Sequence, residues 1–224
     1  PLIPLGLVLL GLRGFTYPAG SETLNNAWCA GCLLLGILGL GIRVATVGHV
    51  PPGTSGRNTR KHVADALNTT GMYSVVRNPL YLGNYLMWLG IALLPRTIWV
   101  PLAVTLLFWL YHERIIFSEE RFLRRKYGAE FEEWARRTPA FLPAFSLWVA
   151  PDHSFSARIA LRREHSGLLA LVTTIMAVML AGDYVVQGRF VVHPAWMIGF
   201  AGTVLLYAVV YILKKKTRLL HEER

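Results

Sequence analysis

The sequence predicts an all-α fold: a polytopic membrane helical bundle of about six transmembrane helices with a cytoplasmic amphipathic helical segment. Two observations carry this prediction. Hydrophobic residues make up 54% of the 224 residues, which is more apolar surface than a soluble core of this length would bury. The charged residues lie mainly between long apolar runs. We therefore expect a single membrane domain over residues 1–224.

Six apolar runs are the candidate helices. A spanning helix needs about 20 residues, so the third run is short. For the same reason the first run is expected to be truncated. The first residue is not Met, so the sequence is expected to begin after its true start, and no cleavable signal is evident. The runs cover residues 2–12, 27–47, 80–94, 98–117, 168–186 and 195–213.

The positions of Lys and Arg predict the orientation in the membrane. They are frequent after the second and fourth runs and at the C-terminus, and rare in the other three connections. Both termini are therefore expected to be cytoplasmic, in a bacterial inner membrane or an endomembrane. Topology explains the net charge of +10 better than a nucleic-acid partner, which would need a basic water-facing fold. Residues 50–70, with Arg57, Arg60 and Lys61, form a candidate cytoplasmic lid.

Small residues in the second run are expected to serve helix packing. Cys29 and Cys32 form a CxxC pattern, but no second ligand pair or βαβ pattern accompanies it, so neither a redox nor a metal site is predicted. Gly36, Gly39 and Gly41 lie inside a membrane helix, where close packing is a better explanation than a dinucleotide-binding turn.

A tight connection predicts which polar residues meet. The third and fourth runs are joined only by residues 95–97, so they should be antiparallel neighbours. Residues at the start of one run then lie beside residues at the end of the other, at one cytoplasmic mouth. The side chains expected to approach one another there are Arg77, Pro79, Tyr81, His112, Glu113, Glu119 and Glu120.

After Phe117 the sequence becomes charged. Ser118 is expected to cap a new helix with an acidic first turn, and Gly128 to end it. A second short helix is predicted over residues 129–137, with Phe131 and Trp134 on one face and Pro139 after its end. Such a helix is expected to lie on the membrane surface.

Two motifs could carry chemistry, and each also has a structural explanation. Glu119 and Glu120 could simply favour a helix start. Because adjacent helical residues point about 100° apart, one acid could instead face the cleft while the other holds a cation. Arg77 could snorkel to the interface, and the aromatic residues that follow could be packing or an aromatic wall. These aromatic residues are Tyr81, Tyr85 and Trp88.

Together these residues resemble the isoprenylcysteine carboxyl methyltransferase and phospholipid N-methyltransferase superfamily of integral membrane enzymes. The resemblance covers a core hairpin and tail over residues 71–143, about a third of the chain, in which five elements occur in order. They are Arg77-Asn78-Pro79-Leu80-Tyr81-Leu82-Gly83, Glu119-Glu120, Tyr127-Gly128, Glu130-Phe131 with Trp134, and Arg137-Thr138-Pro139 with Pro143.

The resemblance implies a site for S-adenosylmethionine, with S-adenosylhomocysteine as product. Asn78 stands where the family usually has His, and an amide cannot exchange a proton near pH 7, so only a hydrogen-bonding role remains for it. The other implied roles are a cation near the cofactor carboxylate, an acid near its ribose or amine, and aromatic walls. The implied cofactor residues are Arg77, Asn78, Pro79, Tyr81, Tyr85, Glu119, Glu120 and Tyr127.

The acceptor side is expected nearer the fifth run. Arg137 could orient a carboxylate or phosphate, and Glu164 or His165 could lie near the acceptor, where His165 could take a proton. The candidate substrate-binding residues are Arg158, Arg162, Arg163 and Trp88. For the arginines, a role in topology is the alternative to a lipid phosphate site. Asp183 is expected to be interfacial, and no metal site is predicted.

The expected function is methyl transfer from S-adenosylmethionine to a membrane lipid acceptor, a headgroup amine or phosphate, at the cytoplasmic face. The alternatives are a prenylated-cysteine carboxyl methyltransferase and a non-enzymatic lipid-binding scaffold or transporter. The expected partner is a lipid or lipidated substrate and not nucleic acid. The oligomeric state and the role of the extra helices over residues 166–213 remain open.

Overall fold

A computed structural model describes residues 2–50 and 66–216 of the chain, and all regular elements in these ranges are helices. The prediction of an all-α bundle is confirmed. The proposed lid residues Arg57, Arg60 and Lys61 lie outside the described residues. The helices are α1 Leu2–Gly11, α2 Glu22–Gly48, α3 Met72–Val75, α4 Pro79–Ala92, α5 Trp99–Tyr127, α6 Ala129–Arg137, α7 Ala157–Gln187 and α8 Pro194–Lys216, with short 3-10 turns η1 Pro18–Gly20 and η2 Phe145–Leu147.

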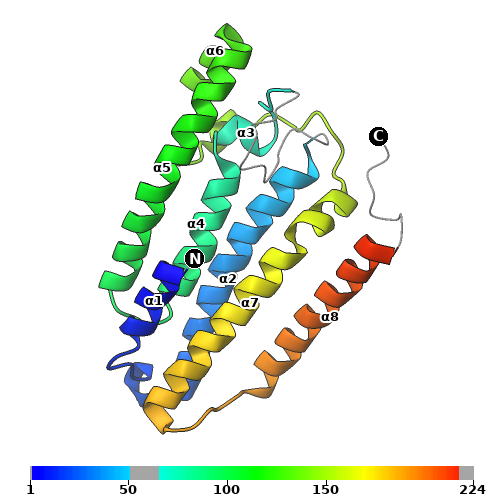
Figure 1. Cartoon of the computed structure of the whole chain (residues 1–224). Helices are drawn as coiled ribbons and strands as arrows, with labels where there is room; N and C mark the ends of the chain where they lie inside the picture. The colour runs from blue at the N-terminus through cyan, green and yellow to red at the C-terminus, as the bar shows by residue number, and fades with distance from the viewer. Residues whose placement is uncertain (1, 51–65, 217–224) are drawn as a thin grey trace.

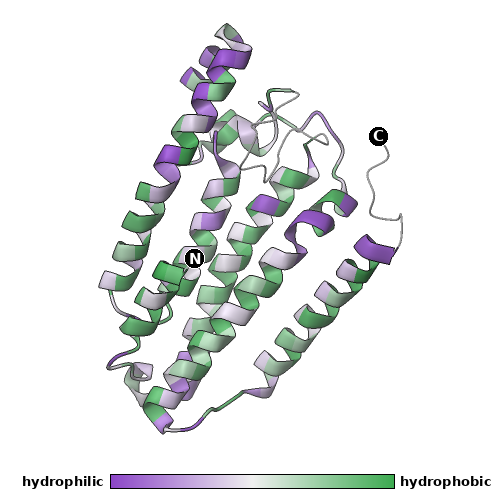
Figure 2. Ribbon diagram, viewed as in Figure 1, coloured by the Kyte–Doolittle hydropathy of each residue, from purple (hydrophilic) through white to green (hydrophobic). Residues whose placement is uncertain are grey.

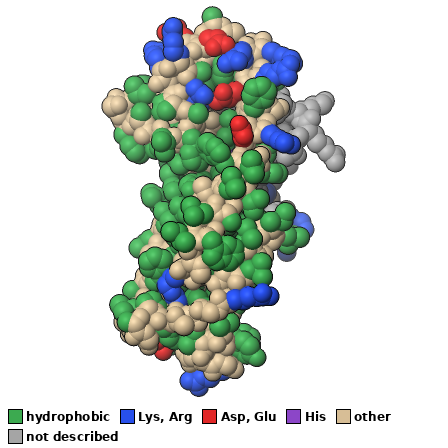
Figure 3. Space-filling model, turned by 90° about the vertical axis from the view of Figure 1, so that its left-hand side faces the viewer, with side chains coloured by type: hydrophobic (Ala, Val, Ile, Leu, Met, Phe, Trp, Pro, Cys, Tyr) green, Lys and Arg blue, Asp and Glu red, His purple; other side chains and the backbone are tan. Residues whose placement is uncertain are grey.

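Among the described residues, four helices, α2, α5, α7 and α8, are long and apolar enough to cross a membrane. Apolar residues dominate the bundle, and polar residues concentrate on α6, the adjoining end of α5 and the helix ends (Figure 2). On the side of the molecule in Figure 3, apolar side chains cover the middle and charged side chains gather toward both ends. The predicted α1 and α4 are also helices, but α1 has 10 residues and α4 only 14, fewer than the roughly 20 that a spanning helix needs.

Helix α2 lies at the centre of the bundle and packs against both α4 and α7 (Figure 1). Helix α5 packs on α4, while α8 lies at the edge against α7. The main core contains residues from α1, α2, α4, α5 and α7, and Cys29 and Cys32 are buried free thiols within it. The packing role predicted for these cysteines is confirmed. We call the end of the bundle that carries α3 and α6 the α3 end.

Glycines allow α2 and α4 to approach closely. A Cβ on Gly39 would meet the backbone of α4 at Gly83 and Met87, and a Cβ on Gly90 would meet the backbone of α2 at Cys32. Gly36 makes room for Leu171 of α7. The close-packing role is therefore confirmed for Gly36 and Gly39.

The prediction for Gly41 is wrong, because it is exposed and a Cβ there would meet nothing within 4 Å.

This difference between Gly39 and Gly41, two glycines on one helix, provides a matched pair of variants. We expect Gly39→Ala to lower the thermal unfolding midpoint in detergent, since the α4 backbone cannot yield as a side chain can. Gly41→Ala should leave the midpoint unchanged or slightly raised, because Ala favours helix. Equal midpoints for the two variants would contradict this close packing.

Helix α5 runs without interruption from Trp99 to Tyr127, so the predicted helix start at Ser118 is wrong. Ser118 is an exposed residue within the helix, and the charged residues after it continue the same helix beyond its apolar part. The predicted stop at Gly128 is confirmed: its φ of 53° is a conformation that glycine adopts without steric cost. Helix α6 has the predicted bounds and buries Phe131 and Trp134.

At the opposite end of the bundle, polar contacts tie the connections together. The Tyr17 hydroxyl donates to Asp183 at 2.6 Å, and Gln187 donates to the Tyr17 oxygen. Asp183 lies on the last turns of α7 and is 7% exposed. In the tight connection between α4 and α5, Arg96 donates to the Asn25 side chain at 2.8 Å. The hydrogen bond from Tyr17 gives Asp183 a structural role. Asp183 lies close to the end of α7, where it was expected.

Candidate functional site

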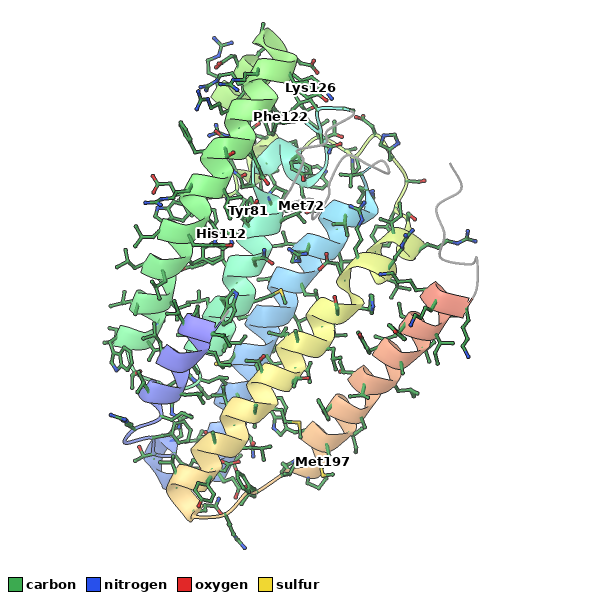
Figure 4. The ribbon with its side chains drawn as sticks, in the orientation of Figure 1. Met72, Tyr81, His112, Phe122, Lys126 and Met197 are labelled. Atoms are coloured by element: carbon green, nitrogen blue, oxygen red, sulfur yellow. The ribbon has the colours of Figure 1, made fainter. Side chains whose placement is uncertain are left out.

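The polar residues of the hairpin converge at the α3 end. The Tyr81 hydroxyl of α4 donates to Glu119 of α5 at 2.9 Å. The Tyr81 ring also lies 5.2 Å from the His112 ring, and the two side chains meet between the helices (Figure 4). The predicted meeting of the two helix ends is therefore confirmed for these residues. Glu113 lies on the exposed surface of α5.

The two adjacent acids have different partners. Glu119 accepts from Tyr81, whereas Glu120 accepts from Arg77 Nε at 3.0 Å. This is the division expected from the angle of about 100° between neighbouring helical residues. Arg77 and Glu120 are only about one-fifth exposed, so this pair is less screened than a surface ion pair.

Arg77 holds the chain that follows α6. Its Nη1 donates to the carbonyls of Ala135, at 2.6 Å, and Thr138, at 3.2 Å, and its backbone N–H donates to Pro139. The side-chain amide of Asn78 donates to the Ala140 carbonyl at 3.0 Å. These bonds join the start of α4 to the chain after α6.

The segment over residues 138–149, which we call the strap, continues along α3. The N–H of Ala144 donates to Val75, and the N–H of Val149 donates to the Ser74 hydroxyl. The Trp134 indole, just before the strap, donates to the Tyr73 carbonyl at 3.0 Å. Helix α3 is thus enclosed by the chain from α6 to the end of the strap.

An aromatic cluster lies below these polar contacts, between α4, α5 and the strap. Tyr85 packs against Phe108 and Phe141, with ring centroids 5.3 and 5.6 Å away, and its hydroxyl contacts Thr105. Phe108 stacks on His112 at 3.8 Å. Tyr81 and Tyr85, for which packing and an aromatic wall were the two interpretations, both make ring contacts here. Trp88 instead packs against the main core.

Tyr73, on α3, is a polar residue of the site that the sequence analysis did not identify. Removal from water, followed by the nearby Glu119 charge, raises the pKa of Tyr73 to about 12, while Arg163 and Arg43 act in the opposite direction. Its phenol therefore stays protonated at neutral pH. Its position eight residues before Tyr81, within the same core hairpin and tail over residues 71–143, was the available signal.

A buried ion pair joins α2 and α7 and also contacts α4. Arg43 contacts both carboxylate oxygens of Glu164, at 2.7 and 2.8 Å, and the Glu164 side chain is only 4% exposed. Breaking such a pair by removing one partner typically costs about 3–5 kcal/mol. The sequence analysis missed Arg43, although a charged residue within an apolar run is itself a signal.

The remaining predicted residues lie around the edge. His165 donates from Nδ1 to the Leu161 carbonyl and stacks on Tyr207 at 5.3 Å. Arg137 is exposed and pairs with Glu133 at 3.4 Å. The Tyr127 ring lies beneath Lys126, at the far end of α5. Of the three arginines of α7, Arg158 is exposed, and Arg162 and Arg163 are half-buried.

Known proteins match the part of the chain that contains the hairpin of α4 and α5. Residues 30–130 match the phospholipid methyltransferase family model, and they contain α4, both acids and the whole of α5. The chain is also 28% identical to the protein-S-isoprenylcysteine O-methyltransferase of Schizosaccharomyces pombe over 49% of this chain and 48% of that protein. The chain is therefore similar to both groups of the membrane methyltransferase superfamily.

Two further relatives are named for metal resistance. The cobalt-zinc-cadmium resistance protein CzcN of Cupriavidus metallidurans is 37% identical over 63% of this chain and 66% of its own length. The nickel-cobalt-cadmium resistance protein NccN of Alcaligenes xylosoxydans xylosoxydans is 36% identical over 58% of both. The chain therefore spans less than two thirds of the length of these curated relatives. No solved structure matches it.

Proposed function

We propose that this protein is an S-adenosylmethionine-dependent methyltransferase whose acceptor is the amine or phosphate headgroup of a membrane lipid. The α3 end would face the cytoplasm. The observation that carries the proposal is the contact of Tyr81 with Glu119. It holds a carboxylate beside an aromatic cluster within the segment that matches the phospholipid methyltransferase family.

The groups at this site fit the chemistry of the cofactor. S-adenosylmethionine presents a carboxylate, an ammonium, a ribose diol, an adenine ring and a sulfonium. Glu119 can accept hydrogen bonds from a diol or ammonium, and the Tyr73 phenol can donate. The rings of Tyr81, Tyr85 and His112 offer aromatic surface for adenine or for a cation. When bound, the cofactor supplies a sulfonium-activated methyl group for direct displacement.

The residues of the chain would then orient the acceptor and exclude water, which are the main requirements of a direct displacement. Tyr81 fixes Glu119, while Arg77 and Asn78 fix the start of α4, at Pro79, against the strap. Arg77 and Asn78 would support the cofactor site by holding the strap in place. Glu120 would act with them through Arg77.

The acceptor would approach from α7. Arg158, Arg162 and Arg163 follow one another along its first two turns and could bind a lipid phosphate. His165 could take a proton from an acceptor amine. Arg137 and Trp88 remain proposals for the acceptor side, although Arg137 contacts Glu133 and Trp88 packs in the core.

A prenylated cysteine carboxylate is the second candidate acceptor, since an isoprenylcysteine methyltransferase is among the relatives. Transfer of labelled methyl groups to phospholipid vesicles or to a prenylcysteine would separate the two. A role in metal resistance, as in the names of two relatives, has no further support. The described ranges 2–50 and 66–216 contain no group of three His, Cys, Asp or Glu that could hold a metal ion.

Calorimetric titration of the purified protein with S-adenosylhomocysteine tests the proposal. We expect saturable binding by the wild type, and a dissociation constant about tenfold or more higher for Glu119→Gln, because a charged hydrogen-bond acceptor is lost. Glu113→Gln is the matched control, since Glu113 is exposed on the same helix, and it should bind as the wild type does. Absence of binding by the wild type in both detergent and nanodiscs would overturn the proposal.

A further inference from the structure

A buried ion pair lies within the apolar part of the bundle. Arg43 is on α2, within two turns of its end at Gly48, and Glu164 is two turns from the start of α7. The pair is bidentate, and its side chains are 11% and 4% exposed. Charged side chains within membrane helices are expensive and usually serve a function. A bidentate contact also fixes the orientation of the guanidinium.

The third nitrogen of Arg43 contacts α4. Arg43 Nη1 donates to the Asn84 side chain at 2.8 Å and to the Leu80 carbonyl at 3.4 Å. Leu80 and Asn84 lie one turn apart, on either side of Tyr81 in the sequence. The guanidinium therefore holds the turn of α4 that carries Tyr81.

A glycine provides the space for this contact. A Cβ on Gly83 would lie only 2.5 Å from Arg43 Cγ. The aliphatic part of Arg43 thus crosses α4 where α4 has no side chain. The carboxylate that orients it comes from α7, which lies outside the segment that matches the family model. The core hairpin is in this way connected to a helix beyond it.

We propose that Glu164 and Arg43 are positioning residues of the cofactor site. Glu164 orients the Arg43 guanidinium, which holds the first turns of α4 so that Tyr81 meets Glu119. This inference rests on the proposed function for its effect on cofactor affinity. It gives Glu164 a role through Arg43, in place of direct contact with the acceptor.

The test uses the full chain in nanodiscs and three variants. Glu164→Gln keeps the shape of the side chain and removes its charge. Arg43→Glu combined with Glu164→Arg restores an opposite-charge pair. Arg96→Gln is the control, because Arg96 also bonds to a buried side chain, that of Asn25, but at the other end of α4. For each protein we would measure the unfolding midpoint, the affinity for S-adenosylhomocysteine and hydrogen exchange at the amides of residues 80–85.

We expect Glu164→Gln to raise the dissociation constant about tenfold or more, since small misplacement of a site is costly. It should also speed exchange at residues 80–85 and leave the helix content unchanged. The charge-swapped variant should recover part of the affinity. Arg96→Gln should lower the unfolding midpoint without changing either affinity or exchange at these residues.

Hydrogen exchange separates this inference from the proposed function. If the amides of residues 80–85 exchange in Glu164→Gln as they do in the wild type, the positioning role is overturned, whether or not S-adenosylhomocysteine binds. If the wild type does not bind S-adenosylhomocysteine but Glu164→Gln speeds this exchange, the proposed function fails while the positioning of α4 stands. If the wild type binds S-adenosylhomocysteine and Glu164→Gln binds it with the same affinity, the inference is overturned while the proposed function stands.

Discussion

Replacement of Arg77 by alanine is expected to release the strap from the start of α4. The variant loses the ion pair with Glu120 and the bonds to the carbonyls of Ala135 and Thr138. The Glu120 side chain would be left partly buried without its cation. We expect a loss of about 3 kcal/mol in the stability of this region, and proteolysis in the strap should be faster than in the wild type.

An exposed ion pair gives the control for this variant. Arg124 contacts Glu132 at 2.6 Å, but both side chains are more than half exposed, and such pairs contribute between about 0 and 1 kcal/mol. Arg124→Ala should therefore leave the rate of strap cleavage close to that of the wild type. If Arg77→Ala is cleaved no faster than Arg124→Ala, Arg77 does not hold the strap.

Replacement of Trp134 by alanine is expected to have an effect of similar size. Trp134 is 7% exposed, packs against Phe131, and donates to the Tyr73 carbonyl. Truncation of a buried Trp typically costs about 3–5 kcal/mol. We expect α6 to detach from α3, which tryptophan fluorescence and amide exchange over α6 would detect.

Two further variants define the cause of that effect. Trp134→Phe keeps most of the apolar contact and removes only the indole N–H, so it should lose less stability than Trp134→Ala. Trp148→Ala, in the strap, removes a side chain that is 51% exposed and should change amide exchange over α6 little. Detachment of α6 in Trp148→Ala as well would show that the strap, and not Trp134, anchors this helix.

Local patterns in the sequence were sufficient for most of the fold. The apolar runs gave the helices, and the spacing of Phe131, Trp134 and Pro139 gave the bounds of α6, because each depends on neighbouring residues. The helix start at Ser118 was wrong because a good capping residue does not stop a helix whose preceding residues also favour one. The face on which Gly41 lies could not be predicted without knowing where α4 and α7 pack.

The hairpin contacts could be predicted from a short connection, but the contacts to α7 could not. Residues 95–97 leave the chain little freedom, so Tyr81 and Glu119 had to meet. Arg43 and Glu164 are separated by 121 residues, and nothing in the sequence between them fixes how α2 and α7 pack. For the same reason the sequence did not indicate that Arg43 and Arg163 lie near Tyr73.

The length of α4 has a consequence for the membrane around it. A helix of 14 residues is about 21 Å long, whereas the hydrocarbon layer of a bilayer is about 30 Å thick. Its neighbours α2 and α7 have 27 and 31 residues. With the Ala92 end of α4 at one interface, the Pro79 end, which carries Tyr81, would lie several ångströms below the opposite headgroups. A bilayer that thins there, as hydrophobic mismatch favours, would bring lipid headgroups down toward Tyr81 without removing their chains from the membrane.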